Sequence, residues 1–382
     1  MKSINVICYD EQTGYGNASA GLISALRQEG FHIDPTLILP GDVQQGGTLV
    51  KEELASEPDA VILHTVPEYY PYWVQKRTQA FPSVPIWGYT AWETDRLPAH
   101  WAALLNGLDG VFVPSTWNRQ VLQASGVQVP VVVLPHVSEF HGRVPETPPG
   151  KALAAALEQA DGHYLFYCIS MWNERKNIPT LIRAFLEEFK REEKVTLLLK
   201  TDHRDWTFYR PSWRRLFLRH SFGDSGRSFK KLVGTHPNRS KLIHLTASLS
   251  SSDLAWIHNK GDCFVSCTRG EGWGMGAYEA AWFGNPVAIT SYGGQLDYLS
   301  PDDAYLLPYT LAPVKTAYGN TSYSAEQKWA HVELADVRRT LRTIYMNQEQ
   351  SREKGALLKR RISQAFTDRT IANTCTEVLF DD

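Results

Sequence analysis

Cysteines are few in this sequence: five among 382 residues, at positions 8, 168, 263, 267 and 375. The count is odd, and no two of them have the Cys-x-x-Cys spacing, so a disulfide framework and a zinc site are both poorly supported. Because disulfides persist mainly in oxidising compartments, we expect a reduced, cytoplasmic protein.

Long apolar runs and an excess of one charge are also missing. No stretch approaches the roughly 20 apolar residues that span a bilayer, and the run Ile4–Tyr9 is too short for a signal-peptide core. The 39 basic and 41 acidic residues nearly cancel, so no overall field attracts nucleic acid. We therefore expect neither a membrane span nor a nucleic-acid partner.

What the chain does contain is enough length and apolar content for two domains. Apolar runs alternate with helical patterns over residues 1–136 and again over 163–350, which predicts βαβ units with parallel sheets. A linker covers 137–162, and we expect 351–382 to form a C-terminal helix that can pack back on the first domain. The predicted strands are Ile4–Cys8, Ala60–Leu63, Val84–Trp87, Gly110–Val113, Val131–Leu134, Tyr164–Ile169, Val195–Lys200, Leu242–Leu245, Cys263–Ser266 and Pro286–Thr290. The predicted helices are Asn17–Gln28, Tyr69–Phe81, Pro98–Asn106, Ser115–Ser125, Ala152–Gln159, Ile178–Lys190, Ser250–Asn259, Met275–Phe283, Ala325–Asn347 and Glu349 to about Val378.

Such sheets bind ligands outside the carboxyl ends of their strands. The fold class we expect is therefore α/β, with two Rossmann-like domains facing a cleft. One segment interrupts the second domain: residues 200–241 hold eleven Lys and Arg against three Asp. It is either a solvated basic insertion or a patch for an anionic acceptor or a membrane surface, which would make the protein peripheral at the inner membrane face.

The strongest motif runs from Arg269 to Val287. A strand ends before it and a helix begins near Met275, so glycines let the backbone approach a ligand and the helix start offers free N–H groups. Two carboxylates, Glu271 and Glu279, can accept hydrogen bonds from hydroxyls. The alternative is a glycine-rich turn with a carboxylate at the helix start. The glycines are Gly272, Gly274 and Gly276.

The two glutamates do not have the spacing of a glycosidase pair. Such carboxyls lie roughly 5–9.5 Å apart, whereas eight helical residues rise about 12 Å. Their spacing instead fits two ends of one long ligand.

Two adjacent cations form the second signal. Arg175 and Lys176 follow the strand Tyr164–Ile169, and at a strand-to-helix turn they suit a diphosphate. Their alternative is a solvated surface pair. We expect the two cations to bind a diphosphate, because the glycine-rich segment belongs to the same predicted sheet.

Three weaker signals lie in the first domain. Gly14 and Gly16 follow the first strand, but Ser19 replaces the third glycine of a dinucleotide fingerprint, so we read a flexible loop facing the cleft, with a plain turn as the alternative. His64 ends a strand and is either a structural hydrogen bonder or a site residue. Tyr15 and the segment around Trp92 and Glu93 can hold a sugar acceptor or form a packed loop.

Together these residues resemble the retaining glycosyltransferases of family 4, which have the GT-B fold. Glu271 and Glu279 match that family's E-x7-E motif, Lys176 its diphosphate-binding lysine, and His64 its donor-site histidine. Gly14 and Gly16 fall on its amino-terminal glycine-rich loop. The likeness covers the layout of about residues 1–310, with one departure: Met171 stands where the family has an arginine, and our hypothesis is that Arg175 replaces it.

The resemblance implies donor roles for these residues. Glu279 should bind ribose hydroxyls, Glu271 the donor sugar with help from the backbone amides of Trp273 to Gly276, and Lys176 with Arg175 the diphosphate. We count Glu271, Lys176 and His64 as catalytic. The remaining donor-site residues are Gly14, Gly16, Gly272, Gly274 and Met275.

The expected function follows from this family. It is transfer of a sugar, a hexose above all, from a UDP- or GDP-sugar to a glycan, a lipid-linked acceptor or another hydroxyl, as in polysaccharide biosynthesis. No Asp-x-Asp motif occurs, so we expect activity without a metal or other cofactor. The alternatives are a non-catalytic nucleotide-sugar-binding partner subunit and a phosphorylase or epimerase of the same fold.

Overall fold

The structure, a computed structural model, describes residues 1–10, 14–138, 140–208, 223–234, 236, 241–315 and 322–380. The chain divides into two compact units, each with its own parallel sheet and core. Unit 1 is residues 1–139 and 363–382, and unit 2 is residues 140–362. The division falls within the predicted linker. The α/β class with two parallel, Rossmann-like sheets is confirmed.

Unit 1 is built on a seven-stranded sheet of order β3-β2-β1-β4-β5-β6-β7, in which only β3 is antiparallel to its neighbour. Its strands are β1 Ser3–Tyr9, β2 His32–Leu39, β3 Thr48–Glu52, β4 Ala60–His64, β5 Ile86–Tyr89, β6 Gly110–Val113 and β7 Val131–Val133. Its helices are α1 Gly14–Gln28, α2 Tyr70–Ala80, α3 Trp101–Leu105, α4 Thr116–Ala124 and α12 Asp368–Leu379.

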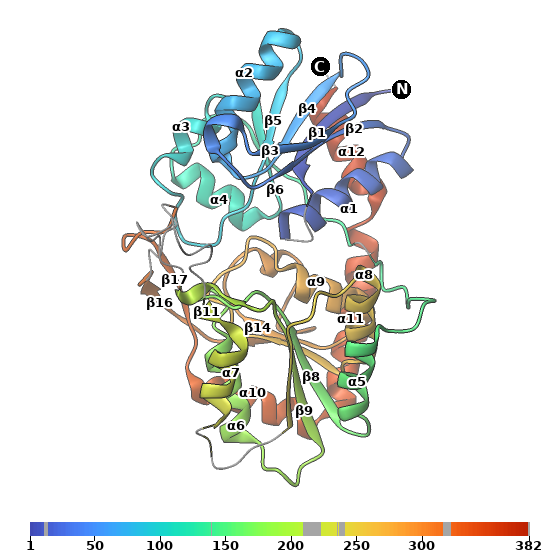
Figure 1. Cartoon of the computed structure of the whole chain (residues 1–382), viewed down its shortest axis with the longest axis vertical. Helices are drawn as coiled ribbons and strands as arrows, with labels where there is room; N and C mark the ends of the chain where they lie inside the picture. The colour runs from blue at the N-terminus through green and yellow to red at the C-terminus, as the bar shows by residue number, and fades with distance from the viewer. Residues whose placement is uncertain are drawn as a thin grey trace, which may run out of the picture. The chain divides into compact units, whose positions relative to one another are not determined.

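The central strands of unit 1 are continuous apolar runs because helices cover both faces of a parallel sheet. All five residues of β4 are buried. The last helix, α12, lies beside α1 and adds Ile371, Ala372 and Cys375 to the core of this unit, although they are distant in sequence (Figure 1).

Unit 2 has a six-stranded, fully parallel sheet of order β12-β9-β8-β13-β14-β15. Its strands are β8 Tyr164–Ile169, β9 Val195–Lys200, β12 Lys241–Leu245, β13 Cys263–Ser266, β14 Val287–Thr290 and β15 Tyr305–Leu307. Two short pairs stand apart: β10 Arg204–Asp205 with β11 Gly223–Asp224, and β16 Thr310–Pro313 with β17 Lys328–His331. Its helices are α5 Lys151–Gln159, α6 Ile178–Glu188, α7 Ser225–Gly234, α8 Ser251–Lys260, α9 Met275–Phe283, α10 Leu334–Met346 and α11 Gln348–Ala365, which runs into residues assigned to unit 1.

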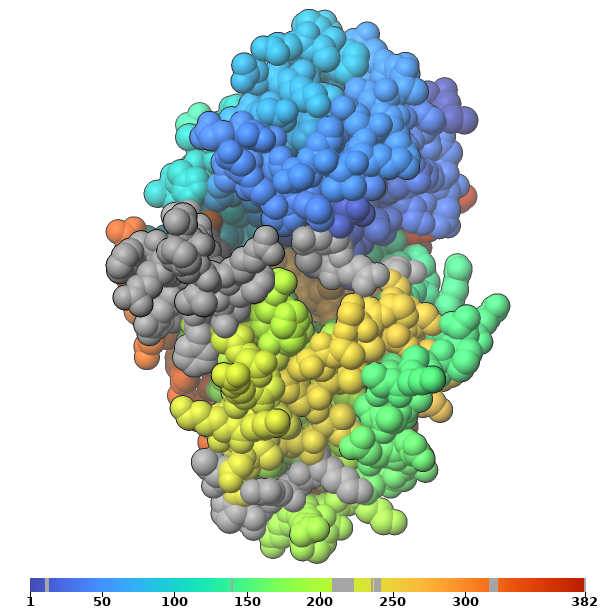
Figure 2. Space-filling model, in the orientation of Figure 1, coloured from blue at the N-terminus to red at the C-terminus, as the bar shows by residue number. Residues whose placement is uncertain are grey.

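The linker lies against α8 of unit 2. The indole of Trp256 donates to the carbonyl oxygen of Thr147 at 2.7 Å, and the amide of Gly150 donates to Asp253 at 2.7 Å. Figure 2 shows the green surface of this segment and α5 bordering the gold surface of α8. Among the described residues, no helix is both long and apolar enough to cross a bilayer.

Three predictions about secondary structure are wrong. The helix predicted over Ala325–Asn347 is the strand β17 followed by α10, because Trp329 and Ala330 pair with β16 in a hairpin. The long last helix is broken between α11 and α12, where Thr367 accepts a hydrogen bond from the amide of Thr370 and caps a new helix. The Gly14–Gly16 segment, predicted as a flexible loop, is the first turn of α1.

Most of the basic insertion lies outside the described residues, which omit 209–222, 235 and 237–240. Its described part is amphipathic. In α7, Phe229, Leu232 and Val233 pack on the core of unit 2, while Arg227 and Lys230 are exposed.

Candidate functional site

The glycine-rich segment connects the end of β13 to the start of α9 in unit 2. Gly274 precedes the helix with a φ of 85°, a left-handed conformation that glycine adopts without strain. The buried hydroxyl of Tyr298 lies 3.0 Å from the carbonyl oxygens of Trp273 and Gly274 and shares its one hydrogen between them. The path of the loop is therefore held by a side chain that follows β14.

Glu271 lies at the centre of an ion-pair cluster. Its Oε1 accepts from Lys176 Nζ at 2.6 Å, and its Oε2 accepts from Arg175 Nη1 at 3.0 Å. Burial raises the pKa of this carboxyl, but the two cations outweigh burial and lower the pKa to about 2. Glu271 is therefore ionised throughout the physiological pH range.

The segment that carries the cations is joined to the main chain of the glycine-rich segment by hydrogen bonds. The amide of Arg269 donates to the carbonyl oxygen of Arg175 at 2.7 Å, and Arg175 Nη1 donates to the carbonyl oxygen of Gly270 at 2.7 Å. The amide of Lys176 donates to the side chain of Asn173 at 2.9 Å, which closes the turn before α6. The two sequence motifs thus form one structure at the carboxyl ends of β8 and β13.

Glu279 lies in α9 and is buried. Burial raises the pKa of Tyr298 well above its usual value, and the negative charges of Glu271 and Glu279 raise it further. Both carboxylates therefore lie close enough to influence the same buried hydroxyl.

Two of the predicted donor-site residues have clear packing roles. A Cβ at Gly276 would lie 3.1 Å from the ring of Phe264 and 3.2 Å from the carbonyl oxygen of Ile169, so this glycine lets α9 approach the sheet. The indole of Trp273 is buried against Tyr278 and Tyr298. Among the others, Gly272 is buried, and Met275 is partly exposed as the first residue of α9.

His64 ends β4 in unit 1, and its side chain is buried. Its ring is stacked on Tyr89, with centroids 4.1 Å apart and planes at 5°, and it forms a T-shaped pair with Tyr15 with centroids 5.8 Å apart. Burial lowers the pKa of His64 well below its usual value, and the nearby His136 lowers it further. This histidine is therefore neutral at physiological pH.

The first turn of α1 contains Tyr15, whose ring contacts the ring of His64. The hydroxyl of Tyr15 lies 2.9 Å from the hydroxyl of Thr90. Gly14 is exposed and Gly16 is buried. A Cβ at Gly14 would meet no atom within 4 Å, so packing does not explain this glycine.

Trp92 and Glu93 differ in how far their side chains are buried. The indole of Trp92 is buried, and its N–H donates to Thr94 at 2.6 Å and to the carbonyl oxygen of Arg96 at 2.7 Å. This arrangement favours the packed-loop alternative for Trp92. Glu93 is partly exposed, and its charge is close enough to raise the pKa of Tyr15.

The sequence analysis missed Tyr298 and His136 around these groups, and it included Tyr89 only as a member of the segment around Trp92 and Glu93. Tyr89 had a readable signal, because it ends the strand next to the one that His64 ends. Tyr298 and His136 follow their strands through irregular segments, so no periodicity marks them.

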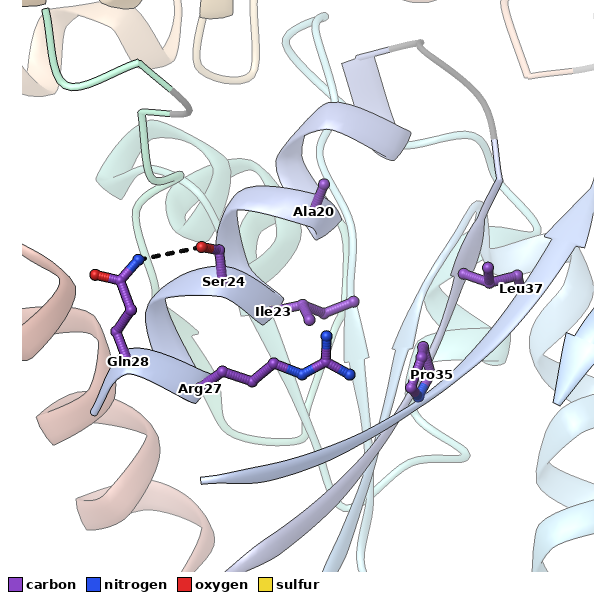
Figure 3. A pocket seen from close by; sticks show the side chains of 7 residues that line it. All are labelled: Ala20, Ile23, Ser24, Arg27, Gln28, Pro35 and Leu37. Atoms are coloured by element: carbon purple, nitrogen blue, oxygen red, sulfur yellow. Dashed lines mark hydrogen bonds between the residues drawn. The ribbon is translucent and has the colours of Figure 1, made fainter. Parts of the chain in front are cut away.

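A surface groove of about 540 Å³ lies elsewhere on unit 1, between α1 and β2. Figure 3 shows Arg27 reaching across it from α1 toward Pro35, with Ile23 and Leu37 on its walls. None of the predicted site residues lines this groove. Among the described residues, no group of three or more His, Cys, Asp or Glu side chains has the arrangement of a metal site.

No family model matches the chain, and no curated protein matches it. Solved structures do match over almost the whole chain. HepE (Alr3699) of Anabaena, solved in complex with UDP and glucose, is 14% identical with a TM-score of 0.66, and the match covers 99% of both chains. Sucrose-phosphate synthase from Thermosynechococcus elongatus is 16% identical with a TM-score of 0.69, over 99% of this chain and 98% of that one.

The chain has the GT-B fold. A third match, an E. coli protein bound with UDP-2-fluoro-glucose, is 12% identical with a TM-score of 0.67 over 99% of both chains. At such identities the likeness concerns the fold, and the chemistry has to be argued from the residues of this chain. In a GT-B chain, the Glu271 cluster lies at the edge where parallel sheets bind ligands.

Proposed function

We propose that the chain is a retaining glycosyltransferase that moves a sugar from a UDP- or GDP-sugar to a hydroxyl of a glycan or lipid-linked acceptor. The observation that carries this proposal is the ionised Glu271 carboxylate, which is bound by Lys176 and Arg175 beside a glycine-rich helix start. The fold supports it, since matching structures were solved with UDP-glucose and with UDP.

The cluster can bind a diphosphate by exchanging the ion-pair partners of Lys176 and Arg175. A diphosphate brings negative charge that competes with Glu271 for Lys176 and Arg175, whose side chains are 18% and 15% exposed. Once the cations turn to phosphate oxygens, Glu271 can accept hydrogen bonds from sugar hydroxyls. Negative charge grows on the diphosphate as the glycosidic bond breaks, so these cations stabilise the transition state more than the ground state.

The other proposed roles follow the resemblance. Glu279 binds the ribose hydroxyls, and the backbone amides of Trp273 to Gly276 face the donor sugar. Gly14 and Gly16 lie in a first helical turn, whose N–H groups favour anions, and His64 contacts the donor sugar or orients the acceptor. With retention, the acceptor attacks from the face that the leaving diphosphate occupies, and a phosphate oxygen takes its proton.

The proposal places the enzyme in the cytoplasm and requires no metal, because Lys176 and Arg175 supply the positive charge that a metal would otherwise bring. Activity should therefore be unchanged in EDTA. Loss of activity in EDTA that Mn²⁺ restores would contradict this part of the proposal.

The testing experiment measures thermal unfolding and nucleotide release with a panel of UDP- and GDP-sugars. A bound donor at 100 times its Kd should stabilise the protein by about 2.7 kcal/mol. We expect slow hydrolysis of the preferred donor, abolished in Glu271→Gln and unchanged in Glu333→Gln, whose parent side chain is 67% exposed.

The other functions give different results in the same experiment. A non-catalytic partner subunit would be stabilised by a donor without releasing nucleotide. A phosphorylase would require inorganic phosphate, and an epimerase would change the sugar with the nucleotide still attached. Any of these outcomes, or no stabilisation by any donor, would contradict the proposal.

A further inference from the structure

Two aromatic side chains lie together in unit 1 because their strands are neighbours in register. β4 pairs with β5 so that Leu63 lies opposite Gly88, and each strand ends one residue later, at His64 and Tyr89. Side chains at adjacent positions of neighbouring strands point to the same face. This register produces the stacking of the His64 ring on the Tyr89 ring, with centroids 4.1 Å apart.

The hydroxyl of Tyr89 fixes the proton of a second histidine. Tyr89 Oη donates to the carbonyl oxygen of Leu134 at 2.5 Å and lies 2.9 Å from Nδ1 of His136. A hydroxyl has one hydrogen, and a carbonyl oxygen only accepts. His136 must therefore carry its proton on Nδ1 and donate it to Tyr89, which leaves Nε2 without a proton in the neutral ring.

Both histidines are held neutral. Burial lowers the pKa of His136 to about 3. The pKa of His64 is also lowered, first by burial and then by the nearby His136. Nδ1 of His64 is buried and has no hydrogen-bond partner among the residues that the structure describes. A neutral imidazole offers one donor and one acceptor, so the orientation of its plane decides what each nitrogen can reach.

We propose that Tyr89 and His136 are positioning residues that hold the plane of the His64 imidazole for its part in sugar transfer. This inference rests on the proposed function. The chain of contacts runs from β7 to β4: the segment after β7 binds the Tyr89 hydroxyl through Leu134 and His136, and the Tyr89 ring lies flat on His64. Tyr15 also contacts the His64 ring in a T-shaped arrangement, with centroids 5.8 Å apart.

The first test is independent of any activity. Nitrogen-15 spectra of the 12 histidines, assigned with His64→Gln and His136→Asn, report which ring nitrogen carries the proton. We expect the Nδ1–H form for His136 at neutral pH, and a shift of the His64 signals in Tyr89→Phe. A His136 with its proton on Nε2, or His64 signals unchanged in Tyr89→Phe, would overturn the proposal.

The second test is kinetic and uses the full chain. Tyr89→Phe keeps the ring and removes the hydroxyl, so we expect kcat to fall on the order of tenfold, in the range for residues that orient a reacting group, with the donor KM little changed. His136→Leu should behave alike, and His136→Asn, which keeps an N–H near the position of Nδ1, should recover much of the loss. Tyr305→Phe is the matched control, because the Tyr305 hydroxyl bonds to Ser351 in unit 2 and not to the groups around His64.

A double-mutant cycle separates positioning from general damage to the fold. In a His64→Ala background, Tyr89→Phe should have no further effect on kcat, because the ring that it positions is gone. An equal tenfold loss in both backgrounds would overturn the proposal. If the wild-type chain turns over no nucleotide sugar, the proposed function fails, while the histidine spectra still decide whether Tyr89 and His136 hold His64.

Discussion

At the scale of single residues, the site is organised by charge. Glu271 is buried and ionised because Lys176 and Arg175 both bind it. Arg175 lies four residues from Met171, where the resembled family has an arginine, and its guanidinium reaches the same carboxylate as the lysine. That Arg175 replaces the missing cation stays a hypothesis, and donor binding tests it.

Replacing Arg175 should weaken donor binding. We expect Arg175→Ala to raise the donor KM, and Lys176→Ala to lower kcat as well, with a barrier about 2.7–4 kcal/mol higher, because removing a group that stabilises developing charge costs this much. Steady-state kinetics with the preferred donor measures both. Arg183→Ala, on the exposed face of α6, is the control. Unchanged donor affinity in Arg175→Ala would show that Arg175 is only a structural partner of Gly270.

The pKa of Glu271 predicts how stability depends on pH. The folded pKa of about 2 lies below the usual value of 4.5, so the carboxylate stabilises the folded protein above the unfolded pKa. This contribution is lost as the pH falls from about 4.5 toward 2. The Tm of the wild type should therefore fall more steeply between pH 5 and 3 than the Tm of Glu271→Gln, and parallel curves would contradict the low pKa.

At the scale of elements, periodicity predicted the buried parts of the fold well. The strands Tyr164–Ile169, Val195–Lys200 and Cys263–Ser266 and the helix Met275–Phe283 have the predicted bounds, because their burial leaves a continuous apolar signal. β3 was missed because all five of its residues are exposed. β2 was missed although most of it is buried, because Asp34 and Pro35 interrupt its apolar run. β17 was read as helix because its pairing with β16 is a contact that no local pattern records.

The candidate site also contains residues that local sequence marks and residues that it does not. The glycines and the two glutamates were readable from spacing alone, and the cations from their place after a strand. Tyr298 was not, since nothing local shows that its hydroxyl reaches back to Trp273 and Gly274. It is also tied to α11, where Arg361 donates to the carbonyl oxygen of Tyr298 and pairs with Asp303.

Removing the Tyr298 hydroxyl should loosen the glycine-rich loop. We expect Tyr298→Phe to lower stability by about 1 kcal/mol, as for one lost hydrogen bond, and to lower kcat while the affinity for UDP alone stays unchanged. Tyr305→Phe is the matched control, since that hydroxyl binds Ser351 of α11 and no loop residue. Equal kinetic effects of the two variants would show that Tyr298 only supports the fold.

At the scale of the whole chain, the sequence order and the spatial order differ at the C-terminus. Residues 363–382 belong to unit 1, where α12 packs beside α1. Hydrophobic patterning predicted a helical segment that can pack back on the first domain, and α12 contacts α1 of unit 1, although the single helix expected there is broken into α11 and α12.

Weakening α12 should unfold unit 1 before unit 2. Ile371 is 1% exposed in the core of unit 1, so Ile371→Ala should cost about 2–5 kcal/mol. Because the two units have separate cores, we expect denaturant unfolding to split into two transitions, with the earlier one assigned to unit 1. Asn373→Ala, on the exposed face of α12, should leave the curve unchanged. A single shifted transition for Ile371→Ala would contradict independent unfolding.

The central claim is that Lys176 and Arg175 bind a diphosphate while Glu271 turns to the sugar. A crystal structure of the chain with a UDP-sugar tests this claim most directly. The account predicts phosphate oxygens within hydrogen-bond distance of Lys176 Nζ, with Glu271 moved from the lysine to a sugar hydroxyl. A donor bound at another place, or bound with the Glu271–Lys176 pair intact, would contradict it.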